Sequence, residues 1–292
     1  MSPAIRLGPL VFPAELAVLI AAAAIGLLAG RLLDRRPRPN RPADVSAVLW
    51  RALIAGLLVA RLGFVWQYRD LYMQDPLQIL DLRDGGWSGL PGLAAAWIYG
   101  AGAMIRRAAP RPAVLGALLL ASLAWFGGGR LTAPASVPPP ALATLALESL
   151  DGTPSTLAAF HGKPTVINLW ASWCPPCRRE MPAFASAQAA NPDVNFVFLN
   201  QGETAPEIRQ YLDQHAPALR NVLRDPASEA SRKMSNRGLP ATLFLDAGGR
   251  LTDLRVGELS TATLAQRLEA IRTAQDRDSR RPVAIRTEKD PD

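Results

Sequence analysis

Residues 170–182 read Trp-Ala-Ser-Trp-Cys-Pro-Pro-Cys-Arg-Arg-Glu-Met-Pro and contain both cysteines of the chain. The five residues before them, 165–169, are largely apolar and partly β-branched, which predicts a short buried strand. After Cys174 come two prolines and then helix formers with apolar residues at helical spacing. We therefore expect a strand-to-helix junction with Cys174 at the helix N-terminus and Pro175 in the first turn, where a missing N–H costs nothing.

This placement predicts that the Cys-x-x-Cys pair is a redox-active dithiol. The pKa of a free cysteine thiol is about 8.5, and a helix N-terminus lowers it by stabilising the thiolate. Cys174, at the exposed start, is expected to attack a disulfide, and Cys177, one turn further in, to resolve the mixed disulfide. An inert structural disulfide and a zinc site are the alternatives. A structural zinc site needs about four ligands, and only His161 and His215 could complement the pair.

The motif Trp-Cys-Pro-Pro-Cys-Arg-x-Glu-Met-Pro resembles that of the membrane-anchored TlpA/ResA-type thioredoxin-like thiol:disulfide oxidoreductases of bacteria. The resemblance covers about residues 141–274, under half of the chain. Residues 236–246, Asn-Arg-Gly-Leu-Pro-Ala-Thr-Leu-Phe-Leu-Asp, are similar to the segment that carries a cis-proline beside the active cysteines in this fold. The resemblance thus implies a cis Leu239–Pro240 bond, and an ordinary trans turn before a strand is the alternative.

The same resemblance implies roles for residues around the cysteines. Glu180 follows Cys177 by three residues and is its neighbour on the helix. It is expected to tune or relay the Cys177 proton, because Asn168 takes a strand position that usually holds an aspartate in cytoplasmic thioredoxins. A surface glutamate paired with a nearby arginine is the alternative. Pro240 lacks an N–H and is expected to leave the preceding backbone free to pair with a substrate strand. The predicted substrate-binding residues are Trp173, Pro175, Pro176 and Leu239.

Strands alternate with helices through residues 141–274 and end in a hairpin, which predicts a thioredoxin-like α/β sandwich with a mixed sheet. The predicted strands are 145–150, 165–169, 195–200, 221–224, 242–245 and 251–256, and the later helices are 205–215, 227–235 and 261–273. The Pro-rich stretch 131–140 predicts a semi-rigid linker before this domain. The charged, apolar-poor stretch 275–292 predicts a disordered tail.

Residues 1–130 contain long apolar runs and predict a transmembrane helical domain. Four runs predict spanning helices: about 10–33, 45–66, 90–105 and 113–126. The last two are close to the lower limit of about 17 residues for a span. A single signal peptide is the alternative. Three further apolar runs and the lack of a clear small-residue cleavage site argue against it.

Arginines predict the orientation of these spans. Residues 31–44 carry five arginines against two aspartates, and residues 106–111 carry three arginines, so these two loops hold +6 of the net charge of +7. This is the positive-inside pattern of membrane topology rather than a nucleic-acid-binding surface. The loop at 67–89 is net acidic and is expected to face outward. Four spans then place the thioredoxin-like domain on the extracytoplasmic or periplasmic side of the bacterial inner membrane, where disulfides persist.

Two charged side chains fall within the predicted spans near their outer ends. Because ionisable groups at such depth usually pair or face a cavity, we predict an ion pair between Glu15 and Arg61. Separate snorkelling of each side chain to the headgroups is the alternative.

The helical region, residues 1–126, faintly resembles prolipoprotein diacylglyceryl transferase, on residues 60–65, Ala-Arg-Leu-Gly-Phe-Val, together with Gly85-Gly86 and Pro91-Gly92. The histidine-glycine-glycine element of that enzyme is absent: residues 85–89 read Gly-Gly-Trp-Ser-Gly, and no histidine occurs in this half. We therefore expect an anchor or docking platform rather than an acyltransferase.

Together these features predict a membrane-anchored protein-disulfide reductase without a metal or another cofactor, since no haem or flavin motif is present. Residues 1–130 contain no cysteine, so a separate membrane thiol donor, DsbD- or CcdA-like, must re-reduce the pair. The partner is a disulfide-containing protein, and the resemblance implies apocytochrome c, hence cytochrome c biogenesis, as one candidate. The alternatives are an oxidase or isomerase of secreted proteins, and a membrane docking protein with a redox-sensing head.

Overall fold

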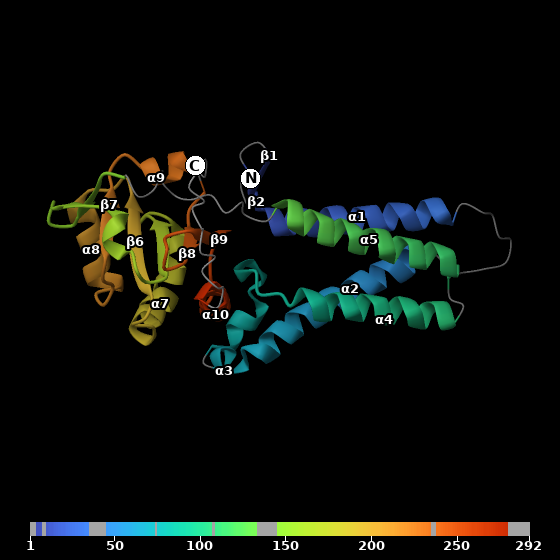
Figure 1. The fold of residues 1–292 in the computed structure, drawn as a ribbon. Helices are drawn as coiled ribbons and strands as arrows, with labels where there is room; N and C mark the ends of the chain where they lie inside the picture. Colours follow the sequence, from blue (N-terminus) through green and yellow to red (C-terminus); the bar gives the residue numbers. More distant parts are fainter. Residues whose placement is uncertain are drawn as a thin grey trace, which may run out of the picture.

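The computed structural model describes residues 4–7, 10–34, 45–73, 75–106, 109–132, 145–234 and 238–279. A helical half and an α/β half lie side by side (Figure 1). Most of the predicted linker and the tail beyond residue 279 lie outside the described residues.

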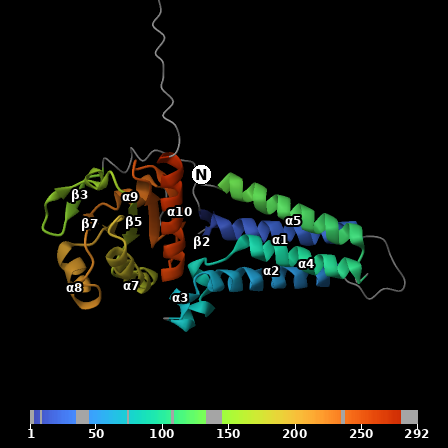
Figure 2. The ribbon, with the colours of Figure 1, turned by 60° about the horizontal axis from the view of Figure 1, so that its bottom comes forward.

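Four apolar helices run alongside one another in the helical half (Figures 1 and 2). They are α1 (Ala14–Leu33), α2 (Val45–Gln67), α4 (Gly89–Ile105) and α5 (Arg111–Thr132). Three of them, α1, α2 and α5, are long and apolar enough to cross a membrane, whereas α4 has 17 residues. Helix α1 packs on α5, and α2 packs on α4 through glycines: a Cβ on Gly92 would lie 2.7 Å from the carbonyl oxygen of Gly56.

Two boundaries of the helical half differ from the prediction. The first helix begins at Ala14, because residues before it form strand β2 (Leu10–Pro13), paired antiparallel with β1 (Ala4–Leu7). Helix α5 continues through three glycines to Thr132, although glycine costs about 1 kcal/mol in a helix interior. Packing offsets part of this cost, because a Cβ on Gly128 would meet the Val18 side chain at 2.7 Å.

The α/β half is built on a mixed seven-stranded sheet in the order β4–β3–β7–β6–β5–β8–β9. Strands β5, β6 and β7 are parallel, and the other pairings are antiparallel, which confirms the predicted thioredoxin-like sheet. The strands are β3 (Leu147–Ser149), β4 (Pro154–Ser155), β5 (Thr165–Trp170), β6 (Asn195–Gln201), β7 (Val222–Asp225), β8 (Ala241–Leu245) and β9 (Leu251–Val256).

Alternation along the central strand β5 places a core on each face of the sheet, because successive side chains point to opposite faces. Val166 packs in one core with Phe184 and Leu268, and Ile167 packs in the other with Val197. The helices are α7 (Pro175–Ala190), α8 (Ala205–His215), α9 (Glu229–Lys233) and α10 (Thr261–Ser279). Helix α10 extends past the predicted end at 273 into the first residues of the predicted tail.

The segment between α2 and α4 joins the two halves. It forms α3 (Arg69–Tyr72) and two short 3-10 helices, η1 (Pro76–Leu80) and η2 (Leu82–Asp84). Helix α10 lies between the sheet and the helical half, with α3 near one of its ends (Figure 2).

The predicted ion pair between Glu15 and Arg61 is wrong. Arg61 pairs with Asp84 at 3.1 Å, whereas Glu15 lies 3.6 Å from Arg255 and 3.9 Å from Arg267. The physical reason is tertiary. The α2–α4 segment folds back over the end of α2 and brings its own carboxylate to Arg61, while the α/β half supplies arginines to the start of α1.

Candidate functional site

The two cysteines lie where the sequence predicts, at the junction between β5 and α7. Strand β5 ends at Trp170, and α7 begins at Pro175. Cys174 is the N-cap residue, with extended backbone angles of φ −89° and ψ 108°. Its Sγ accepts a hydrogen bond from the Cys177 N–H, with an N–S distance of 3.3 Å. An N–H group of the first turn is therefore directed at the sulfur on which a thiolate would form.

Cys174 and Cys177 form a disulfide, with their Cα atoms 5.3 Å apart. Cys174 is 3% exposed and Cys177 is 0% exposed. The prediction that Cys174 is exposed at the start of the helix is therefore wrong for the disulfide form. Its neighbour Trp173 is 66% exposed, and Pro175 is exposed as well. The disulfide joins Cys174 to the fully buried Cys177. Trp173 and Pro175, on either side of Cys174 in the chain, are the exposed residues next to it. Within the described residues, no group of three or more His, Cys, Asp and Glu side chains could hold a metal ion.

Glu180 is buried beneath this junction and is 1% exposed. Its Oε1 accepts a hydrogen bond from Asn168 Nδ2 at 2.8 Å, and its Oε2 accepts one from the Leu259 N–H at 3.0 Å. The alternative of a surface glutamate paired with an arginine is wrong, because the nearby Arg179 binds Glu258 instead, at 2.6 Å. Burial leaves this carboxyl with two neutral donors and no direct cationic partner.

Burial raises the pKa of Glu180 from its ordinary value of 4.5 to about 8, and the hydrogen bonds from Asn168 and the Leu259 N–H oppose part of that rise. The cost of removing a charged carboxylate from water is the dominant effect. Glu180 therefore holds its proton at pH 7 and releases it only slightly above. A carboxyl in this range can exchange protons with a thiol, which an ordinary glutamate does poorly.

This pKa predicts a pH-dependent stability that Glu180→Gln removes. Between pH 4.5 and about 8 the unfolded chain loses the Glu180 proton while the folded chain keeps it, so wild-type stability falls as pH rises. Relative to the wild type, the free energy of unfolding of Glu180→Gln should show no gain below pH 4.5 and a gain of at most about 5 kcal/mol above pH 8. Thermal unfolding in detergent at pH 5, 7 and 9 measures this. Parallel pH dependences of the two proteins would contradict it.

The Leu239–Pro240 bond is cis, which confirms that expectation. Pro240 is buried, and its carbonyl oxygen accepts a hydrogen bond from the Gly257 N–H at 2.9 Å. Leu239 is half-buried and packs against both cores of the α/β half. This segment precedes β8, the strand that pairs with β5, so it lies next to the strand that leads to the cysteines.

Sequence reasoning missed Glu203, which holds the loop before Cys174. Its Oε2 accepts hydrogen bonds from the Ser172 N–H and from Asn200 Nδ2, both at 2.6 Å, and its Oε1 accepts one from Ser172 Oγ. The sequence held a signal for this contact. Glu203 follows the predicted strand β6 and Ser172 follows the predicted strand β5, and neighbouring parallel strands end at the same edge of a sheet. The carboxylate therefore fixes the backbone two residues before Cys174.

Comparisons with known proteins match the two halves separately. The family model Redoxin matches residues 132–270, and the family model Prolipoprotein diacylglyceryl transferase matches residues 13–131. Thioredoxin-like protein YneN of Bacillus subtilis is 30% identical over 129 residues, which is 42% of this chain and 74% of that protein. Thiol:disulfide interchange protein DsbE of Allochromatium vinosum is 30% identical, covering 38% of this chain and 60% of DsbE. Thiol-disulfide oxidoreductase ResA of Geobacillus thermodenitrificans is 25% identical, and the match covers 43% of this chain and 73% of ResA.

Proposed function

Because the chain belongs to the Redoxin family, as a thiol:disulfide oxidoreductase of the DsbE and ResA type, we propose that it reduces protein disulfides through Cys174 and Cys177. The observation that carries the proposal is the position of Cys174 Sγ at the N-terminus of α7, where it accepts an N–H hydrogen bond. The N-terminal end of a helix favours the thiolate, which is the attacking species in thiol–disulfide exchange.

Reduction begins when the Cys174 thiolate attacks one sulfur of a substrate disulfide. The substrate S–S bond breaks, a mixed disulfide forms, and the released substrate thiolate takes up a proton. The Cys177 thiol then loses its proton and attacks Cys174 Sγ, which releases the second substrate thiolate. Two electrons have passed to the substrate, and the protein is left with the Cys174–Cys177 disulfide, the state found in the structure.

We assign the proton of Cys177 to Glu180. Burial raises the pKa of Glu180 to about 8, so near neutral pH this carboxyl can take up and release a proton, whereas an ordinary glutamate stays ionised. Cys177 is fully buried one helical turn before Glu180, which places Glu180 to accept the thiol proton when Cys177 attacks. The pair Asn168 and Leu259 N–H holds both carboxyl oxygens and orients the group.

The helical half acts as a membrane anchor in this proposal. Helices α1 and α4 end, and α2 and α5 begin, at the end remote from the α/β half (Figure 1). The arginine-rich loops follow α1 and α4, so the positive-inside pattern supports an extracytoplasmic α/β half. The helical half has no cysteine to relay electrons, and a separate membrane thiol donor of the DsbD or CcdA kind completes the cycle.

A Cys177→Ser variant is expected to trap its substrate as a mixed disulfide through Cys174, because no thiol remains to resolve it. The measurement is a non-reducing gel of membranes from cells expressing the variant, followed by mass spectrometry of the adduct. Capture of apocytochrome c identifies the cytochrome substrate that the resemblance implies. The matched control, Cys174→Ser with Cys177 intact, should capture much less, and equal capture by both variants would contradict the assigned order of attack.

A further inference from the structure

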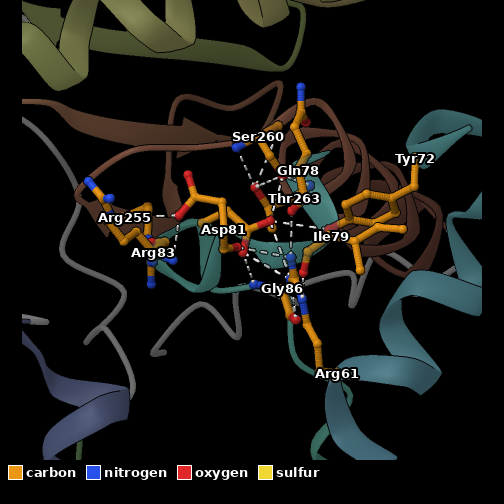
Figure 3. A network of polar contacts seen from close by, with 11 residues as sticks. Arg61, Tyr72, Gln78, Ile79, Asp81, Arg83, Gly86, Arg255, Ser260 and Thr263 are labelled. Atoms are coloured by element: carbon orange, nitrogen blue, oxygen red, sulfur yellow. Dashed lines mark hydrogen bonds and ion pairs between the residues drawn. The ribbon is translucent and has the colours of Figure 1, made fainter. Parts of the chain in front are cut away.

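The α/β half contacts the α2–α4 segment of the helical half through side chains at the start and on one face of α10. Ser260 Oγ, in the residue before α10, donates to Asp84 Oδ2 at 3.0 Å. Tyr68 OH donates to Glu269 Oε2 at 3.0 Å. Figure 3 shows Ser260 and Thr263 of the α/β half above the loop that carries Asp81 and Gly86. The two halves are thus joined by polar contacts at defined atoms.

Asp84 is the centre of this network and is 4% exposed. Its Oδ1 accepts hydrogen bonds from Arg61 Nη1 at 3.1 Å and from the Gly86 N–H at 3.0 Å. Its Oδ2 accepts them from Tyr72 OH at 3.2 Å and from Ser260 Oγ at 3.0 Å. Three of the four donors belong to the helical half and hold the carboxylate in place. The fourth belongs to the α/β half, so Asp84 is a fixed point against which Ser260 is positioned.

Arg61 fixes the loop that carries Asp84. Besides its ion pair, the guanidinium donates hydrogen bonds of 2.9–3.1 Å to the carbonyl oxygens of Gln78, Ile79, Asp81 and Gly86. Figure 3 shows Arg61 among Gln78, Ile79, Asp81 and Gly86, whose carbonyl oxygens it binds. One buried arginine of α2 therefore organises both 3-10 helices and holds the Asp84 carboxylate that meets Ser260.

Ser260 connects this fixed point to Glu180 through one peptide unit. Its hydroxyl accepts a hydrogen bond from the Thr263 N–H at 3.2 Å, and its own N–H donates to Thr263 Oγ1 at 2.9 Å, so it also caps α10. The adjacent Leu259 N–H is the donor to Glu180 Oε2 at 3.0 Å. Displacement of Ser260 therefore moves the N–H that holds the buried carboxyl.

We propose that Asp84 of the helical half is a positioning residue for Glu180, acting through Ser260 and the Leu259 N–H. This rests on the proposed role of Glu180 in proton transfer from Cys177. The helical half then does more than anchor the chain, because its docking against the α/β half sets the proton affinity of the group that serves the dithiol. An undocked α/β half would have a weaker Leu259–Glu180 hydrogen bond and a slower resolving step at neutral pH.

The groups around Glu180 determine whether its pKa rises or falls when the Leu259 N–H moves away. Asn168 faces it from β5, Leu259 N–H faces it from the loop before α10, and Cys177 lies one turn before it on α7. The charged groups that act on it are Glu258, which raises its pKa, and Arg179, which lowers it. The Leu259 N–H stabilises the ionised carboxylate, so loosening this bond raises the pKa of Glu180.

The test uses the full chain in detergent micelles and reacts the reduced dithiol with a small aromatic disulfide between pH 6 and 10. It measures the rate at which the second aromatic thiolate is released, because Cys177 releases that thiolate when it attacks Cys174 Sγ. A plot of this rate against pH should have a midpoint for the wild type that is missing for Glu180→Gln. That midpoint is the reference for the other variants. Ser260→Ala is expected to raise this midpoint by about one unit. Ser260→Gly removes the same hydroxyl at less cost to the helix cap and should give the same shift. It replaces Ser260→Ala in the test if the alanine variant folds poorly. Ser260→Thr keeps a hydroxyl and should restore the wild-type midpoint.

Tyr68→Phe is the matched control, because it removes one hydroxyl from another hydrogen bond between the halves, to Glu269. It should leave the midpoint unchanged. An unchanged midpoint in both Ser260 variants would overturn the proposal, as would an equal shift in Tyr68→Phe, which would indicate general loosening. A wild-type profile that Glu180→Gln does not alter would instead contradict the proposed function of Glu180, so the two failures are distinguishable.

Discussion

Cys174→Ser is expected to lower disulfide reduction by about a thousandfold or more, to the background rate. The nucleophile in the proposed reaction is the Cys174 thiolate at the helix N-terminus, and a serine hydroxyl stays protonated and does not attack disulfides. Cys177 does not replace it, since it lies inside the first turn of α7 and not at the N-cap, where Cys174 Sγ accepts an N–H hydrogen bond. The measurement is reduction of insulin disulfides by the full chain in detergent, supplied with a chemical thiol as the donor.

Cys177→Ser separates attack from resolution in the same assay. It should still form one mixed disulfide per chain but should not turn over, because the resolving thiol is missing. Both variants are compared with the reduced wild type by thermal unfolding, so that loss of the disulfide is matched in all three. Cys174→Ser protein that is folded and still reduces insulin at the wild-type rate would remove Cys174 from the role of nucleophile.

Arg61→Met is expected to destabilise the protein by about 3–5 kcal/mol, the usual cost of leaving one partner of a buried ion pair uncompensated. Both charged groups are buried, at 3.1 Å from one another. The variant leaves the Asp84 carboxylate without its counter-charge and four carbonyl oxygens without their donor. Thermal or denaturant unfolding in detergent measures the loss, and limited proteolysis between residues 67 and 89 reports the opening of the loop.

Arg69→Met is the matched control for this prediction. Arg69 also pairs with an aspartate of the same segment, Asp70 at 3.6 Å, but both side chains are largely exposed. Exposed pairs contribute only about 0–1 kcal/mol, because water screens the charges. The double variant Arg61→Met with Asp84→Asn should recover part of the loss by removing the unpaired charge, yet the four carbonyl oxygens stay without a donor. Equal stabilities of Arg61→Met and Arg69→Met would contradict a structural role for the buried pair.

Local sequence was sufficient for the redox pair and for much of the fold. An apolar strand, a Cys-x-x-Cys pair with two prolines and a following helix decide the N-cap position of Cys174, because capping depends on residues within one turn. The same is true of the alternating strands and helices of the α/β half and of the four apolar helices. Their boundaries were less accurate: α1, α5 and α10 each begin or end several residues from the prediction, where tertiary packing decides the last turns.

By itself, the sequence determined which residues form the dithiol and which segments are apolar enough to cross a membrane. Only the tertiary structure decided that Glu180 is buried between donors 12 and 79 residues away, and that Arg61 pairs with Asp84 rather than Glu15. The reason is physical. The pKa of a buried carboxyl and the partner of a buried arginine depend on which remote groups remove water and supply hydrogen bonds, and no local stretch of sequence contains those groups.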